Sequence, residues 1–151
     1  MEITGNYTFS ANQEAVWKLL MDPDAIAAAL PGVDEMLPVE NEANAWQAIV
    51  KVSIGTVSGQ YSGYVRMADI EAPNQYRLNV DGEGQNSIIS GSALISLVPE
   101  GSDKTVVSWT ATANISGKIA SIGQRLIKAT ANMMSKRFFN GLAKQIPERE
   151  K

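Results

Sequence analysis

The feature that most constrains the fold is residues 33–115, which contain only strand patterns separated by short turn clusters. Apolar and polar side chains alternate along the segments, as in strands with one buried and one wet face. We therefore predict a meander of about six antiparallel strands. The turn clusters lie at 41–44, 55, 72–74, 82–86 and 99–103.

A strand and two short helices are expected before the meander. Residues 2–9 alternate between apolar and polar side chains, which predicts a half-buried strand. Ser10, followed three positions later by Gln13, has the form of a capping box for the first helix. Asp22 precedes a proline and can cap the second helix. The two helices are expected within 12–30.

A long helix is expected after the meander. No proline interrupts residues 117–146, and apolar side chains recur there at helical spacing. A helix of about 30 residues follows from this pattern. The chain of 151 residues has the commonest length for one domain, so we predict a single α+β domain over 1–147 with a frayed tail at 148–151.

The composition excludes several classes of function. The chain contains no Cys and no His. Disulfides, thiolate or imidazole metal sites and Ser-His-Asp catalysis are therefore ruled out. Acid-base chemistry would depend on carboxylates, Lys or Tyr. We expect a binding protein with no catalytic residues and no metal site.

Basic side chains are concentrated near the C-terminus. Residues 116–146 carry six basic side chains and no acidic one, although the net charge of the chain is -3. A solvated helix face would explain them, and so would a surface for anionic lipid headgroups or an acidic partner. A sequence pI of about 5.0 argues against nucleic acid. On one continuous helix, a single quadrant would hold Lys118, Arg125, Lys128 and Lys136.

Two adjacent aromatic residues, Phe138 and Phe139, cannot both face the sheet, because neighbouring helical residues point about 100° apart. Phe139 is therefore predicted either to contact a partner or membrane or to widen the apolar face. The chain shows neither a leader pattern nor an apolar run of transmembrane length. We expect a cytoplasmic protein with peripheral contact at the inner face of the membrane.

Many residues on the predicted inner face of the sheet are small, where a filled core would carry larger side chains. Close approach of the helix would explain this, and so would a cavity for a hydrophobic ligand such as a lipid. The small positions are Gly5, Ala48, Gly59, Gly63, Gly91, Ala93, Ala111 and Ala113. The cavity walls would also include Tyr61, Val65, Leu78 and Trp109 from the sheet, with Ile122, Gly123, Leu126 and Met133 from the helix.

Four ordered motifs resemble those of the carbon monoxide dehydrogenase G-subunit family, and the likeness runs over 1–146. The motifs are residues 21–33 (MDPDAIAAALPGV), 52–63 (VSIGTVSGQYSG), 117–127 (GKIASIGQRLI) and the Phe138-Phe139 pair. That family is a branch of the START-like helix-grip superfamily. The resemblance implies a curved seven-stranded antiparallel sheet that wraps around the C-terminal helix and encloses a hydrophobic ligand.

The resemblance also implies a function. It implies an accessory protein of a CO dehydrogenase-type molybdenum hydroxylase, which recruits the enzyme to the membrane and binds the quinone that takes its electrons. Such a protein holds no covalently bound cofactor. Many relatives carry Cys on both sides of the Pro-Gly pair, where this chain has Leu30 and Val33, so no thiol role is transferred.

Two alternatives to the accessory role stay open at this stage. A cyclase, hydrolase or isomerase could occupy the same cavity, because one fold hosts many chemistries. That reading needs an inward ionisable group, and the predicted register places Tyr7, Tyr61 and Tyr76 there. A pure interaction protein, with the gap filled by side chains, is the other alternative.

Overall fold

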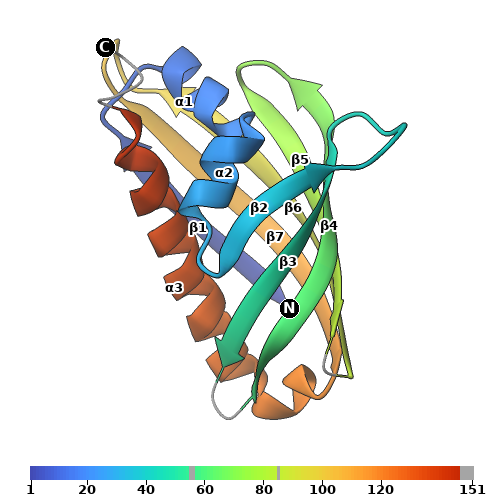
Figure 1. Cartoon of the computed structure of the whole chain (residues 1–151). Helices are drawn as coiled ribbons and strands as arrows, with labels where there is room; N and C mark the ends of the chain where they lie inside the picture. The colour runs from blue at the N-terminus through green and yellow to red at the C-terminus, as the bar shows by residue number, and fades with distance from the viewer. Residues whose placement is uncertain (55–56, 85, 147–151) are drawn as a thin grey trace.

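Seven strands form one antiparallel sheet that curves around an interior (Figure 1). The computed structural model describes residues 1–54, 57–84 and 86–146, and the expected frayed tail at 148–151 lies outside them. The strand order is β1-β7-β6-β5-β4-β3-β2, so the first strand pairs with the last. The strands are β1 (Glu2–Phe9), β2 (Val33–Pro38), β3 (Ala45–Ile54), β4 (Val57–Glu71), β5 (Gln75–Gly84), β6 (Ser87–Pro99) and β7 (Thr105–Gly117).

Two short helices, α1 (Gln13–Leu20) and α2 (Pro23–Ala29), cover one end of the sheet (Figure 1). The prediction that Asp22 caps the second helix is confirmed, since its Oδ1 accepts from the backbone N–H of Asp24. The predicted capping box at Ser10 is wrong. Asn12 caps α1 instead, and its Oδ1 accepts from the backbone N–H of Ala15 at 2.8 Å.

The long C-terminal helix α3 (Gln124–Ala143) has 20 residues and is shorter than expected. A short 3-10 helix, η1 (Ile119–Ile122), precedes it. Gly123 separates them with φ +102°, a conformation that side-chain-bearing residues rarely adopt. The prediction of one helix of about 30 residues is therefore wrong, because the chain turns at this glycine.

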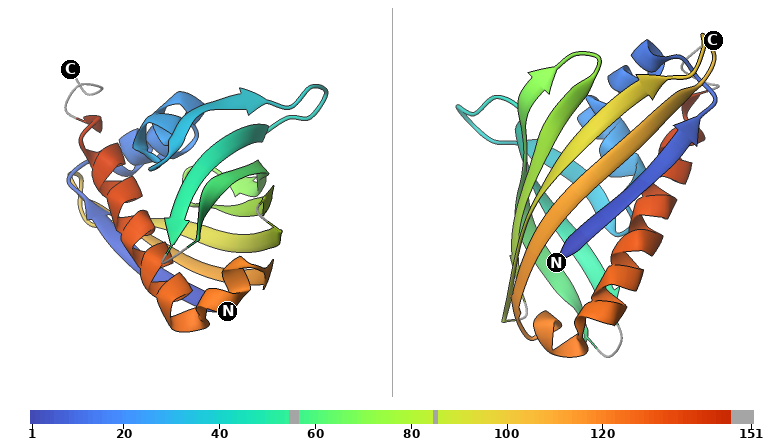
Figure 2. Two further views of the ribbon diagram at one scale, coloured as in Figure 1. Left: turned by 60° about the horizontal axis from the view of Figure 1, so that its bottom comes forward. Right: turned by 180° about the vertical axis from the view of Figure 1, so that it is seen from behind.

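The helix α3 lies along the open side of the curved sheet, between the edge strand β1 and the opposite edge (Figure 2). It packs closely on α2, because a Cβ at Gly141 would lie 3.2 Å from the Cα of Ala29. The segment η1 lies at the opposite end of the sheet from α1 and α2 (Figure 1). The interior is therefore bordered by the sheet, by α3 along its side, and by helices at both ends.

Candidate functional site

The sheet residues that were predicted to line the cavity lie on its inner face. Tyr61 is buried and the half-buried Gly63 and Val65 alternate with exposed neighbours on β4. The register pairs Met67 with Leu78, Leu78 with Ala93 and Ala93 with Ala111 across four strands. Since residues in one cross-strand row share a face, the structure brings together Tyr61, Gly63, Val65, Leu78, Trp109 and Ala111.

The buried apolar residues form two separate clusters. The larger one packs α1, α2 and the C-terminal half of α3 onto the sheet, with Phe9, Val107 and Leu142 among its buried members. The smaller one lies at the η1 end and contains Tyr61 and Ile119. The buried apolar side chains of the described residues therefore form a main core and a smaller satellite cluster at the opposite end of the sheet.

Six apolar residues that face the interior belong to neither cluster and are only half-buried. We call this set the middle band. Its members are Ile3, Val80, Ala111, Ala113, Ala131 and Met134. Two of them, Val80 and Ala113, lie in the same cross-strand row, on either side of Gly91. These apolar side chains remain partly accessible although they point to the inside of the fold.

Aromatic residues close the end of the middle band nearest α1 and α2. Phe139 stacks on Trp109 with ring centroids 4.5 Å apart, and it also stacks on Tyr7 at 5.7 Å. Its side chain is 5% exposed. The predicted role of Phe139 as an exposed contact is therefore wrong, because the aromatic residues of β1 and β7 enclose its ring.

The other end of the middle band is closed by Tyr61 and the η1 segment. Tyr61 packs with Ile119 and with Ile127 of α3, and the predicted wall residue Ile122 packs against this cluster. The hydroxyl of buried Ser87 accepts from the backbone N–H of Ile119 at 2.9 Å and fixes η1 to the start of β6. The hydroxyl of Tyr61 is buried and has no hydrogen-bond partner among the described residues.

The expected inward orientation of three helix-side residues is wrong. Leu126 is 41% exposed and Met133 is 47% exposed. Gly123 is exposed and lies between the two helices, not within one. The reason is the pairing of apolar neighbours, since Leu126-Ile127 and Met133-Met134 each offer two residues about 100° apart. Sequence reasoning missed that Ile127 and Met134, rather than their neighbours, turn to the interior.

Four predicted surface bases are exposed, but they do not share one helix. Arg125, Lys128 and Lys136 belong to α3, whereas Lys118 precedes η1. Within residues 1–54, 57–84 and 86–146, none of these four forms an ion pair. Their charges therefore remain free to attract anions at the surface.

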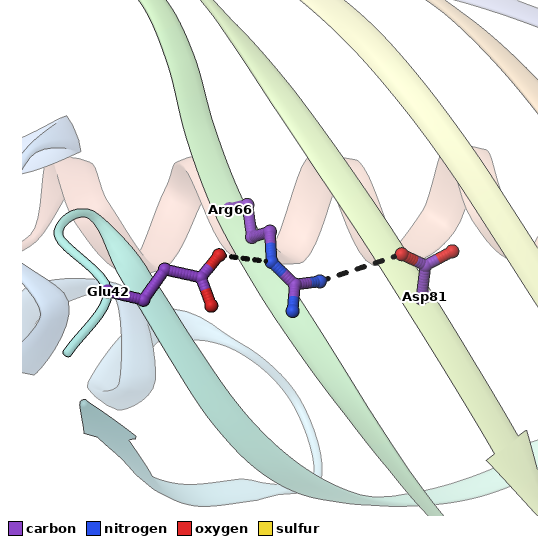
Figure 3. A network of polar contacts seen from close by, with 3 residues as sticks. All are labelled: Glu42, Arg66 and Asp81. Atoms are coloured by element: carbon purple, nitrogen blue, oxygen red, sulfur yellow. Dashed lines mark hydrogen bonds and ion pairs between the residues drawn. The ribbon is translucent and has the colours of Figure 1, made fainter. Parts of the chain in front are cut away.

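The outer face of the sheet carries a polar network (Figure 3). Arg66 lies between two carboxylates, with its Nε 2.6 Å from Glu42 Oε1 and its Nη1 3.7 Å from Asp81 Oδ2. The hydrogen bond to Glu42 is the main cause that raises the pKa of Arg66. Its guanidinium also lies over the ring of Tyr64, 5.1 Å from the centroid. The network joins β4, β5 and the loop before β3 and does not reach the interior.

The interior offers hydroxyl groups for chemistry rather than charged groups. The buried polar residues of the described chain are Ser87 and Thr105, so no carboxylate or amine is buried there. The hydroxyl of Thr105 donates to the carbonyl oxygen of Ala11. Burial raises the pKa of Tyr76, which keeps that phenol neutral. Catalysis in this interior would depend on Tyr7, Tyr61 or Tyr76, which are the inward tyrosines.

Solved structures similar to the chain share its architecture. A conserved protein from Geobacillus kaustophilus has 28% identity and a TM-score of 0.93, over 98% of this chain and 96% of that one. A START superfamily protein from Mycobacterium smegmatis has 13% identity and a TM-score of 0.70, over 97% of each chain. The Zhui aromatase/cyclase from Streptomyces sp. R1128 has 12% identity and a TM-score of 0.70, over 100% of this chain and 96% of that one. The fold is the START-like helix grip that the sequence predicted.

No curated protein matches the chain. Among the described residues, no helix is both long and apolar enough to cross a membrane.

The family was also predicted correctly. The family model of the carbon monoxide dehydrogenase G-subunit (CoxG) matches residues 5–147. Because this match spans nearly the whole chain, the protein belongs to the CoxG family, the carbon monoxide dehydrogenase G-subunit family.

Proposed function

We propose that the protein is a non-catalytic accessory protein that binds a hydrophobic ligand, an isoprenoid quinone, between the sheet and α3. The middle band carries this proposal. Its apolar side chains lie inside the fold and yet stay partly accessible. Exposed apolar surface is unfavourable by about 25 cal/mol per Å². A ligand that covers the middle band would recover that free energy.

The chemistry of the walls supports a ligand with a planar head and an aliphatic tail. At one end Trp109 and Phe138 are half-buried and surround the ring of Phe139. Flat aromatic faces of this kind favour stacking with a planar ring. Along the rest of the middle band the side chains are aliphatic or small, as in Val80 and Ala113, and match a hydrocarbon chain.

Ligand binding can be tested with a variant whose larger side chain fills the proposed ligand site at the middle band. Ala113→Leu adds three carbons to the middle band, whereas Thr112→Leu adds a similar side chain to the outer face of the same strand. Isothermal titration calorimetry with a short-chain naphthoquinone is expected to show saturable binding by the wild-type protein. We expect Ala113→Leu to weaken binding at least tenfold and Thr112→Leu to leave it unchanged.

Stability separates this proposal from a side-chain-filled interaction module. If the interior is open, Ala113→Leu changes the free energy of unfolding by less than about 1 kcal/mol, whereas overpacking a filled core destabilises by about 1–3 kcal/mol. A loss in that range, together with no quinone binding by wild type, would support the interaction module. Mass spectrometry of lipids extracted from gently purified protein provides a second readout, and co-purified quinone is the expected result.

The family supports a place for this protein beside a CO dehydrogenase-type molybdenum hydroxylase, at the membrane where quinones reside. The free bases of α3 support contact with anionic headgroups, each worth about 1 kcal/mol near such a surface. Arg125→Glu with Lys128→Glu is expected to abolish sedimentation with vesicles containing phosphatidylglycerol. The matched control reverses Lys51 and Lys104, two exposed bases outside α3. Unchanged sedimentation of the α3 variant would contradict the membrane role.

A further inference from the structure

A second surface lies on the outer face of the sheet, where a hollow of about 860 Å³ is bordered by two exposed isoleucines. Ile49 is 52% exposed and Ile88 is 60% exposed. Between them in the same cross-strand row lie Ser62 and Glu83. The small serine leaves room between the larger side chains. The hollow also reaches buried Tyr61 and Ser87 at the η1 end. Ile49, Ser62, Glu83 and Ile88 themselves point away from the middle band, because outward and inward residues alternate along each strand.

The exposed apolar surface continues into the next row. That row runs from Leu37 on β2 through Gln47 to Tyr64 and Asp81. Leu37 and Tyr64 are both exposed. A smaller hollow of about 290 Å³, lined by Tyr64 and Ile88 among others, adjoins the first and shares Ser62 and Glu83 with it. We call these two rows the outer patch. From β2 to β6 it spans about 19 Å, at about 4.8 Å per strand.

The charge of the outer patch is negative. Its charged side chains are Asp81 and Glu83. Asp81 pairs with Arg66, whereas Glu83 has no ion pair in the part of the chain that the structure describes. An unpaired carboxylate between two exposed isoleucines favours a partner group that carries a cation beside an apolar side chain. The same negative charge disfavours contact between the outer patch and an anionic membrane. An anionic membrane would instead be attracted to the basic side chains of α3.

We propose that the outer patch is a docking surface for a protein partner that presents aliphatic side chains next to a Lys or Arg. Its width exceeds what a single small ligand needs, and contiguous exposed apolar surface of this kind marks protein contacts. The partner's aliphatic side chains fill the hollow between Ile49 and Ile88, and its cation pairs with Glu83. This inference does not depend on the proposed quinone, since Ile49, Glu83 and Ile88 point away from the interior.

The test uses a phage-displayed library of random twelve-residue peptides, selected on the whole chain of 151 residues. We expect enrichment of sequences with Lys or Arg beside Leu, Ile or Val. The best peptide is then synthesised and titrated by fluorescence anisotropy. Glu83→Lys and Ile88→Ser are each expected to weaken binding at least tenfold. The matched controls are Glu100→Lys and Val98→Ser, which change an exposed acid and an exposed β6 aliphatic outside the outer patch and should leave affinity within twofold.

Three results would overturn the proposal. The first is a library that gives no saturable binder, and the second is a binder whose affinity is the same for Ile88→Ser and Val98→Ser. The third is concentration-dependent self-association in analytical ultracentrifugation that Glu83→Lys abolishes, because the occupant would then be a second copy of this chain. Circular dichroism of each variant shows that it is folded before the affinities are compared.

Discussion

Phe139 stacks on Trp109 with ring centroids 4.5 Å apart and ring planes 14° from parallel. This contact connects α3 with β7 at the end of the middle band nearest α1 and α2. Three further aromatic rings, those of Tyr7, Phe9 and Phe138, surround the same phenylalanine. The stack therefore fixes the position of α3 over the sheet and one boundary of the proposed ligand site.

Phe139→Ala is expected to lower the free energy of unfolding by about 3–5 kcal/mol, as large-to-small changes of buried Phe do. Urea denaturation measures the effect. Met133→Ala, at an exposed position on the same helix, serves as control and should change stability by less than about 0.5 kcal/mol. A small loss for Phe139→Ala would contradict the stacking role.

Gly5→Ala is expected to displace the indole of Trp109. A Cβ at Gly5 would lie 2.5 Å from Trp109 Cζ2, and the indole also stacks on Phe139. We predict a loss of about 1–3 kcal/mol and a changed near-ultraviolet circular dichroism spectrum. In the control Gly91→Ala the nearest atom to the new Cβ would be Thr112 O at 3.4 Å, so a much smaller loss is expected. Equal losses for the two variants would argue against this contact.

Tyr61→Phe is expected to stabilise the protein by about 1 kcal/mol, because it removes a buried hydroxyl without a described partner. Tyr7→Phe provides the contrast. The hydroxyl of Tyr7 donates to Asn140 Oδ1 at 3.0 Å, so its removal should destabilise by about 1 kcal/mol. Thermal and urea unfolding of both variants measure the difference. Destabilisation by Tyr61→Phe would mean that its hydroxyl is hydrogen-bonded in solution.

Stability should fall above pH 10 in a way that depends on Tyr76. Burial raises the pKa of Tyr76 above the value of about 10 that an exposed phenol has. The unfolded chain therefore loses this proton at a lower pH than the folded protein. The contribution is fully present below about pH 10 and decreases as the pH rises, by up to about 1.4 kcal/mol per pH unit. Urea midpoints at pH 9 and pH 11 measure it.

One variant separates Tyr76 from other groups that titrate at high pH. Tyr76→Phe should flatten the alkaline decrease, because a phenylalanine has no proton to lose. Its ring still packs edge-on against Trp17, as the ring of Tyr76 does at a centroid distance of 5.6 Å. Identical slopes for wild type and Tyr76→Phe would exclude Tyr76 as the cause.

Much of the architecture followed from local patterns. The period-2 alternation predicted the meander and its inner face, and Asp22 before a proline predicted the cap of α2. These features depend on neighbours in the chain, whose side-chain directions the backbone sets. The family motifs predicted the START-like helix grip, which the structure confirms.

The side of the last helix that faces the interior could not be predicted from the sequence. Leu126-Ile127, Met133-Met134 and Phe138-Phe139 each contain two apolar neighbours, so either member could face the interior. The break at Gly123 also shifts the helix relative to the preceding segment. Contacts with distant strands selected Ile127, which packs with Tyr61, and Phe139, which stacks on Trp109.

The sequence by itself determined the strands, the family and the small residues of the inner face, because these depend on periodicity and residue type. Only the tertiary structure decided that the core divides into two clusters, that Phe139 is enclosed, and that Ile49, Ile88 and Glu83 meet on the outer face. Such relationships join residues far apart in the chain. The physical reason is that register and helix placement are set by packing across the whole sheet, which no local pattern contains.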